Sequence, residues 1–394
     1  MSDINKLNKI DLITSAGDFI SLFSIMTITT NLRSIGEAAV IATVFKYLSM
    51  VFGTILAPYF VKRHHAKTVL SAAQFLSAMC SLFVILLTLK KPVNIDAIKV
   101  IFLFIATLQV IYANARDSFY KFATENENRT HKETATGFFN SLYSAQFFGP
   151  LIAFTLLHLF PISTVLSLDF ISFFITGFMI LKLKFNPIMG SKDVNFRLAC
   201  SYITNRDEVR DLFLLRSVVF WFGIAIINVE ITNFMGVNFH WNGTWAALIW
   251  STQGAGSLFG VWITKREWFK KLKLHPWKIS SIGLFILSLG VILLIFSKNE
   301  LFALSSIFFA TIGAGLNAPS SQQIRAEIVD KHFFSQVVSL ELFVGRLVGA
   351  TSGTLAGVYL SNNLSINQWL LLGSLIISIG AIGNLRLRKI KHTN

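Results

Sequence analysis

Charged residues are scarce in this chain of 394 residues. Asp, Glu, Lys and Arg together make up 14% of it, whereas soluble proteins carry about a quarter. A soluble domain of this length would need more charged surface. The deficit accompanies a hydrophobic content of 53%, including 38 Phe, and it predicts that much of the surface faces lipid.

Cysteine is also scarce, since Cys80 and Cys200 are the two in the chain. Cys80 lies in an apolar stretch and Cys200 in a polar one, so we expect no disulfide and no thiolate metal site. The sequence has no phosphate-binding loop, no metal-ligand cluster at helical spacing, and no nucleophile with an identifiable base. These absences predict a protein that is not an enzyme and holds no cofactor or resident metal.

Long apolar runs are abundant. A helix needs about 20 apolar residues to span a bilayer, and about twelve runs qualify in a chain whose polar start, Met1 to Lys9, shows no cleavable signal. Their continuous apolar character excludes short alternating β-barrel strands and surface helices. The predicted spans are 11–31, 38–61, 68–89, 98–121, 135–157, 163–183, 211–235, 244–264, 279–297, 301–324, 337–360 and 369–386.

The basic residues between these runs are unevenly distributed. If the N-terminus is cytosolic, nearly all Lys and Arg fall in inside loops, a set that includes Arg325. The positive-inside rule then places both termini and the polar linker 185–210 in the cytosol of a bacterial inner membrane. It also explains the net charge of +15 without a nucleic-acid partner. The outside loops keep a few basic residues, namely Arg33, Lys90, Lys91, Lys99 and Lys298.

The chain contains an internal repeat. One ungapped offset of 203 residues, the distance from Asn114 to Asn317, aligns several features. The offset covers six spans, an even number, so the halves share one orientation. The predicted organisation is a bundle at 1–184, a linker at 185–210 and a bundle at 211–394. The aligned features include Asn114-Ala115 with Asn317-Ala318, Lys62-Arg63 with Lys265-Arg266, and Gly53 with Gly256.

This organisation resembles the major facilitator superfamily, and within it the bacterial branch that exports drugs and siderophores. The residues that carry the resemblance are Gly17-Asp18-Phe19, the stretch 53–70, Gly149-Pro150 and the segment 317–357. Two family features are missing. The loop after the second span has Lys62 where the family has an aspartate, and Leu151-Ile152-Ala153 stands where a glycine pair follows Gly149-Pro150. The resemblance implies an all-α membrane protein with two parallel six-helix bundles that transports by alternating access.

Ionisable and amide side chains within the spans are the candidate functional residues. A charge at the bilayer centre costs roughly 2.5–3.5 kcal/mol on insertion scales, so such residues usually face a cavity or a partner. Arg216, one turn into its span, is expected to snorkel to the inside face. The candidates are Lys46, Asn114, Glu230, Gln253, Asn317 and Arg346 for substrate binding, Asp18 and Glu341 for proton coupling, and Lys62, Arg63, Arg116 and Asp117 for gating.

The sequence therefore predicts a secondary active transporter that exports a small molecule, such as a siderophore or a drug-like solute, in exchange for protons. The absence of a nucleotide motif makes an ion gradient the energy source. The expected partners are a small-molecule substrate, protons and the bilayer, and the protein is expected to be a monomer. Two alternatives stay open: an importer of a nutrient or metal chelate on the same fold, and a lipid flippase or membrane sensor.

Overall fold

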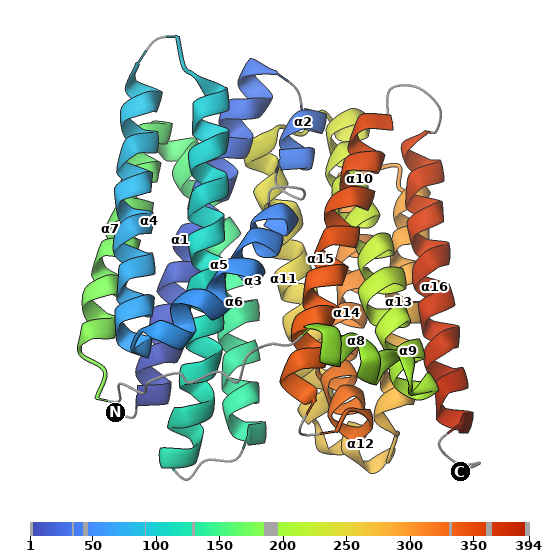
Figure 1. Ribbon diagram of the computed structural model, residues 1–394. Helices are drawn as coiled ribbons and strands as arrows, with labels where there is room; N and C mark the ends of the chain where they lie inside the picture. Colours follow the sequence, from blue (N-terminus) through green and yellow to red (C-terminus); the bar gives the residue numbers. More distant parts are fainter. Residues whose placement is uncertain are drawn as a thin grey trace. The chain divides into compact units, whose positions relative to one another are not determined.

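The computed structural model describes residues 3–33, 35–41, 46–90, 92–127, 131–184, 196–330, 333–359 and 365–390. In these ranges the structure consists of helices, and none forms a β-strand element. Nine helical segments within the described part are long and apolar enough to cross a membrane. Each of the predicted spans coincides with a helix or with consecutive helices (Figure 1).

The helices fall into two compact units, one comprising Met1–Asp193 with Asn242–Ser251 and the other Val194–Trp241 with Thr252–Asn394. The helices before the central linker are α1 (Asp3–Leu32), α2 (Ile35–Val40), α3 (Lys46–Arg63), α4 (Ala66–Leu89), α5 (Ile95–Asn126), α6 (His131–Leu159) and α7 (Ile162–Leu181). Those after it are α8 (Phe196–Thr204), α9 (Asp207–Phe213), the π-helix η2 (Leu214–Phe220), α10 (Trp221–Phe239), α11 (Gly243–Lys265), α12 (Glu267–Lys271), α13 (Pro276–Ile295), α14 (Glu300–Ile328), α15 (Phe334–Tyr359) and α16 (Ile366–Ile390).

Local chemistry explains where several helices begin and end. The side chain of Asn299 accepts a hydrogen bond from the backbone N–H of Phe302 and so caps α14. Asn242 caps α11 in the same way, by accepting from the N–H groups of Thr244 and Trp245. Pro276 occupies the first turn of α13, where its missing N–H has no intrahelical partner to lose. His240 ends α10 in the left-handed conformation, with φ of 57°.

The predicted second span, 38–61, coincides with α2 and α3, and residues 42–45 lie outside the described residues. The polar linker 185–210 contains α8 and the first turn of α9. Helix α8 forms because its apolar residues share one face and are buried against the ends of α14 and α15. This cluster comprises Ala199, Tyr202, Ile203, Val209, Val329, Val337 and Leu340.

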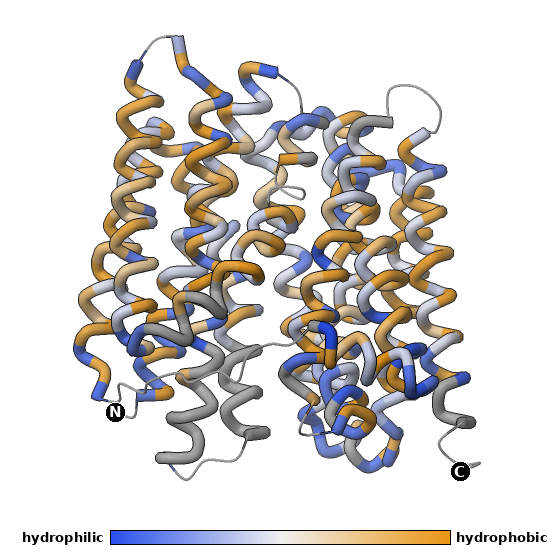
Figure 2. The backbone as a smooth tube through the Cα atoms, viewed as in Figure 1, coloured by the Kyte–Doolittle hydropathy of each residue, from blue (hydrophilic) through white to orange (hydrophobic). Residues whose placement is uncertain are grey.

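The order of helix neighbours is the same in both units. In the first, α1 packs on α6 and α7, and α4 packs on α5 and α7. In the second, α10 packs on α15 and α16, and α13 packs on α14 and α16. Figure 2 shows apolar residues along most of the length of these helices, with hydrophilic residues gathered at helix ends and on α8, α9 and α12. The repeat seen in the sequence is therefore a repeat of packing.

Glycines at related positions permit one further close contact in each unit. A Cβ at Gly53 of α3 would overlap the Val110 side chain of α5. A Cβ at Gly256 of α11 would overlap the Phe308 carbonyl and the Thr311 hydroxyl of α14. Because the two glycines are related by the repeat offset, each unit uses the absence of a side chain at one equivalent point to bring its second and fourth spans together.

Candidate functional site

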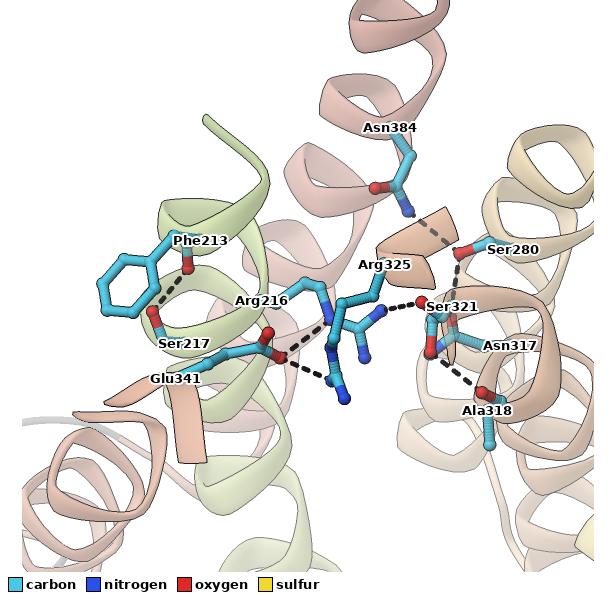
Figure 3. A network of polar contacts seen from close by, with 10 residues as sticks. All are labelled: Phe213, Arg216, Ser217, Ser280, Asn317, Ala318, Ser321, Arg325, Glu341 and Asn384. Atoms are coloured by element: carbon cyan, nitrogen blue, oxygen red, sulfur yellow. Dashed lines mark hydrogen bonds and ion pairs between the residues drawn. The ribbon is translucent and has the colours of Figure 1, made fainter. Parts of the chain in front are cut away.

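An ion cluster of three residues joins three helices of the second unit (Figure 3). Arg216 Nε of η2 lies 2.9 Å from Glu341 Oε1 of α15, and Arg325 Nη2 of α14 lies 2.8 Å from the same oxygen. Arg216 also donates from Nη1 to the backbone carbonyl of Ser321, at 2.5 Å. The carboxylate side chain is 4% exposed, and those of Arg325 and Arg216 are 10% and 18% exposed.

The cluster has two positive charges around one negative charge. Glu341 is a charged partner of both guanidinium groups, so losing its charge would leave two cations facing each other in a largely buried place. Removing one partner of a buried ion pair typically costs about 3–5 kcal/mol. Glu341 was predicted to couple protons, but these contacts favour a role in holding η2, α14 and α15 together. Arg216, expected to snorkel, and Arg325, expected in a loop, instead converge on it.

The π-helix η2 is the element that places Arg216. It lies within a continuous helical stretch, 207–239, that forms the seventh span. Its wider turn also includes Ser217, which donates a hydrogen bond to the Phe213 carbonyl one turn earlier. π-Turns are rare and occur frequently at functional sites. Here the turn directs a guanidinium group toward α14 and α15.

A neutral junction lies beside the ion cluster in the same unit (Figure 3). The Ser280 hydroxyl of α13 donates to Asn317 Oδ1 of α14 at 2.6 Å. It also accepts a hydrogen bond from Asn384 Nδ2 of α16 at 3.0 Å. Asn317 was a candidate substrate ligand, and its carbonyl oxygen bonds a neighbouring helix. Polar residues of this kind commonly fasten membrane helices to one another.

Glu230 of α10 is the second ionisable group inside this unit. Glu230 is fully buried, with an exposed fraction of 0%. The side chain of Asn233, three residues further along the same helix, interacts with the Glu230 carboxyl group, but within the described residues the two make no hydrogen bond of normal length and angle. The described part of the chain also records no ion pair to Glu230. An ionised carboxylate left unpaired in such a place is energetically unfavourable, so this acid differs from Glu341.

The first unit has a smaller charged contact near the start of α1. Asp11 Oδ1 accepts a hydrogen bond from the Tyr112 hydroxyl at 2.8 Å. The guanidinium of Arg116, a predicted gating residue, lies 3.8 Å from the same oxygen. Asp11 was missed by sequence reasoning, although an acid at the beginning of an apolar span was the available signal. The contact joins α1 to α5.

The other candidates are dispersed over several helices. Asn114 donates to the carbonyl of Val110 in its own helix, at 2.8 Å. Gln253 is buried on α11, whereas Asp18 on α1 and Arg346 on α15 are partly exposed. The backbones of Lys46, Lys62 and Arg63 belong to α3 and that of Asp117 to α5, but their side chains lie outside the described residues.

The fold and the repeated packing agree with a family model. The Major Facilitator Superfamily model matches residues 12–353 of the chain. The chain belongs to the major facilitator superfamily. It is therefore a multi-pass membrane protein of the transporter type, with the all-α fold of two parallel six-helix bundles. No curated protein sequence matches it significantly.

Solved structures of other superfamily transporters are similar over nearly the whole chain. A POT family transporter in complex with a thioalcohol-conjugated peptide has a TM-score of 0.74 at 14% identity. The aligned region covers 95% of this chain and 94% of the chain of that transporter. The human organic anion transporter MFSD10 has a TM-score of 0.71 at 10% identity, with coverage of 97% and 99%. The nucleoside transporter NupG has a TM-score of 0.69 at 13% identity, with coverage of 99% and 100%. Identities this low establish the fold alone.

Proposed function

We propose that this major facilitator protein is a proton-coupled secondary transporter that exports a small organic solute across a bacterial inner membrane, with both termini in the cytosol. The observation that carries the proposal is Glu230, a fully buried carboxyl group that has no ion-pair partner in the described part of the chain and only the neutral side chain of Asn233 as a polar neighbour. A group of this kind is stable as the neutral acid, and it becomes stable as an anion when water reaches it.

Alternating access provides the change of environment that such a group needs. When the two halves of a superfamily transporter rock, a site near the midplane passes between the two aqueous compartments. Glu230 would take up a proton from one compartment and release it to the other when α10 becomes hydrated. Because the sequence has no nucleotide-binding motif, the proton gradient supplies the energy. Glu341, held by two arginines, is not needed for this step.

The direction of transport rests on α6. Pro150 lies within this helix, and Gly149 has no room for a Cβ because Ala16 and Phe19 of α1 lie against it. This arrangement supports the resemblance to the exporter branch, whose fifth span carries the same glycine and proline. The second candidate function is proton-driven import. It is favoured by Leu151-Ile152-Ala153, which replaces the glycine pair of the exporter motif.

We propose that the residues that contact the solute are among those that take no part in the ion cluster or the neutral junction. These are Lys46, Asn114, Gln253 and Arg346, with Asp18 as a second candidate for proton coupling. Lys46 and Arg346 are cations and suit an anionic solute. Of the proposed gating residues, Lys62 and Arg63 lie at the end of α3, and Arg116 and Asp117 lie in the C-terminal third of α5.

Reconstituted vesicles test the proposal. The purified protein in liposomes, with a pH gradient imposed across the membrane, is offered citrate, a dipeptide, a nucleoside and a lipophilic cation in turn. Proton movement is followed with a pH-sensitive dye and solute movement with radiolabel. We expect gradient-driven movement of at least one class in the wild type. Glu230→Gln should lose gradient-driven movement while keeping solute exchange without a gradient, because glutamine keeps the shape but cannot change charge.

A matched control is Glu300→Gln, since Glu300 is an exposed acid in the first turn of α14 that accepts a hydrogen bond from Trp241 Nε1 at 3.0 Å. A glutamine can still accept that bond, so transport should be retained. Full gradient-driven transport in Glu230→Gln would contradict the proposed role of Glu230. Lipid scrambling without movement of any solute would favour a flippase instead.

A further inference from the structure

A second buried carboxyl group lies in the first unit and is not part of the proposed coupling step. Asp169 of α7 is 0% exposed. Its Oδ2 atom accepts hydrogen bonds from two hydroxyl groups on two other helices, Ser21 of α1 and Ser81 of α4, the latter at 2.8 Å. Its Oδ1 atom has no hydrogen-bond partner within the described ranges. Three spans thus meet at one carboxyl group.

A glycine makes room for this group. A Cβ built on Gly17 of α1 would lie 2.8 Å from Asp169 Oδ1 and would overlap the hydroxyl of Ser172. The unpartnered oxygen therefore faces the bare backbone of α1, and no side chain of α1 lies between them at that point. Ser172 donates its hydrogen to the backbone carbonyl of Asp169, at 2.8 Å. The arrangement leaves Oδ1 enclosed between α1 and α7.

No positive charge compensates Asp169 among the described residues. The bundle has other titratable groups, but those with recorded contacts are engaged elsewhere: Asp3 with Lys6, Asp11 with Arg116, Lys67 with the Leu183 carbonyl, and His158 with the Phe154 carbonyl. The titratable groups on the helices packed against Asp169 are Asp3, Lys6, Lys9, Asp11 and Asp18 on α1, Lys67 and Cys80 on α4, and Tyr143 and His158 on α6, where the side chains of 131–140 lie outside the described residues.

Two hydroxyl donors are too few to stabilise an anion in this place. A buried carboxylate without a cation needs several strong hydrogen bonds to offset its lost hydration. Asp169 receives two, both on one oxygen, and the other oxygen receives none. A carboxylic acid group fits the same contacts better, because Oδ2 then serves as the carbonyl acceptor for Ser21 and Ser81. Oδ1 then carries the hydrogen.

We propose that Asp169, Ser21 and Ser81 form a proton-binding site inside the first unit, in which the bound proton fastens α1 to α4 and α7. The proton forms an O–H bond at Oδ1, and its release to water leaves a carboxylate on Asp169. That release requires α1 to separate enough from α7 for water to enter. Occupancy of the site therefore governs the packing of the first span, whether or not Glu230 couples protons to a solute.

Infrared spectroscopy of the full chain in lipid nanodiscs tests the site directly. Aspartate labelled with heavy carbon at its carboxyl group shifts only aspartyl bands, so a protonated Asp169 is separated from a protonated Glu230. We expect the wild type at neutral pH to show a protonated aspartyl C=O band that shifts with the label. The band should be lost in Asp169→Asn and kept in Glu230→Gln.

A milder variant guards against misfolding of Asp169→Asn. In Ser81→Ala the carboxyl group keeps one donor, so the labelled band should persist and move to higher frequency as its C=O loses a hydrogen bond. The proposal is overturned if the wild type shows no labelled protonated band at neutral pH, or if the band is unchanged in both Asp169→Asn and Ser81→Ala. Loss of transport in Glu230→Gln with an intact aspartyl band would support both proposals, and a missing band with normal coupling would refute only this one.

Discussion

The two units place different chemistry at related points of the same packing. Ser77 and Ser280 are related by the repeat offset, and each joins its span to a neighbouring helix. In the first unit Ser77 accepts a hydrogen bond from Gln109 Nε2 at 2.9 Å, and in the second Ser280 bonds Asn317 and Asn384. Asp169 of the first unit, however, corresponds by the same offset to an apolar residue, Leu372.

The charged contacts made by the first membrane span of each unit also differ. In the first unit the acid Asp11 lies on that helix and meets Arg116 of α5. In the second the base Arg216 lies on it and meets the carboxylate of Glu341, which Arg325 shares. Helix packing therefore depends on features common to both units, such as Gly53 and Gly256. The ionisable groups differ between the units, so we expect any difference in role between the halves to depend on them.

The largest expected effect is the loss of the carboxylate in the second unit. Glu341→Gln leaves Arg216 and Arg325 without a counter-charge, which should destabilise the protein by about 3–5 kcal/mol. Thermal unfolding of the purified protein in detergent measures this. Asp11→Asn should cost less than half as much, because the Arg116 guanidinium lies 3.8 Å from Asp11 Oδ1, farther than the 2.8 and 2.9 Å contacts of Glu341.

The control for this comparison is Glu208→Gln, which removes a partly exposed acid from α9 that has no ion pair among the described residues. It should leave the melting temperature within error of the wild type. If Asp11→Asn destabilises the protein as much as Glu341→Gln does, the two charged contacts are equivalent and the distinction between the units fails.

The next effect tests what the units share. Gly53→Ala and Gly256→Ala should each destabilise the protein by about 1–3 kcal/mol, since each new methyl group overlaps a packed neighbour. Gly380→Ala on α16 is the matched control, because a Cβ there would lie 3.6 Å from its nearest neighbour, Val219 Cγ1. Melting temperatures should fall in the first two variants and stay unchanged in the third. A neutral Gly53→Ala beside a damaging Gly256→Ala would show that the packing is not truly repeated.

The smallest effect separates the paired asparagines. Asn317→Ala removes an interhelical hydrogen bond and should cost about 0.5–1.5 kcal/mol. Asn114→Ala removes a hydrogen bond to a carbonyl one turn away in the same helix, and its effect on the melting temperature should be smaller. If instead Asn114→Ala abolishes solute binding while Asn317→Ala does not, Asn114 contacts the solute and only Asn317 serves packing.

Apolar run length predicted the spans well, because crossing a bilayer imposes a minimum length on each helix. The helices of the linker could not be predicted, since α8 is short and much of the cover of its apolar face comes from residues distant in the sequence, such as Val329 and Leu340. The ion cluster could not be predicted from the sequence for a related reason. Arg216, Arg325 and Glu341 are far apart in the sequence, and each has an unremarkable role when considered alone. Asp169 lies within the predicted span 163–183, but its donors Ser21 and Ser81 lie on two other spans, and the sequence does not show that the three residues meet.

The π-helix in the seventh span determines what a one-residue deletion in this span would do. One residue fewer in Leu214–Phe220 would allow ordinary α-helical hydrogen bonding throughout 207–239. Because the wide turn accommodates one residue more than an α-helical turn, the deletion would leave the flanking segments 207–213 and 221–239 facing much as they do now. Only the local turn that carries Arg216 would change. The deletion therefore isolates the contribution of the irregular turn to the contact between Arg216 and Glu341 from that of the rest of the span.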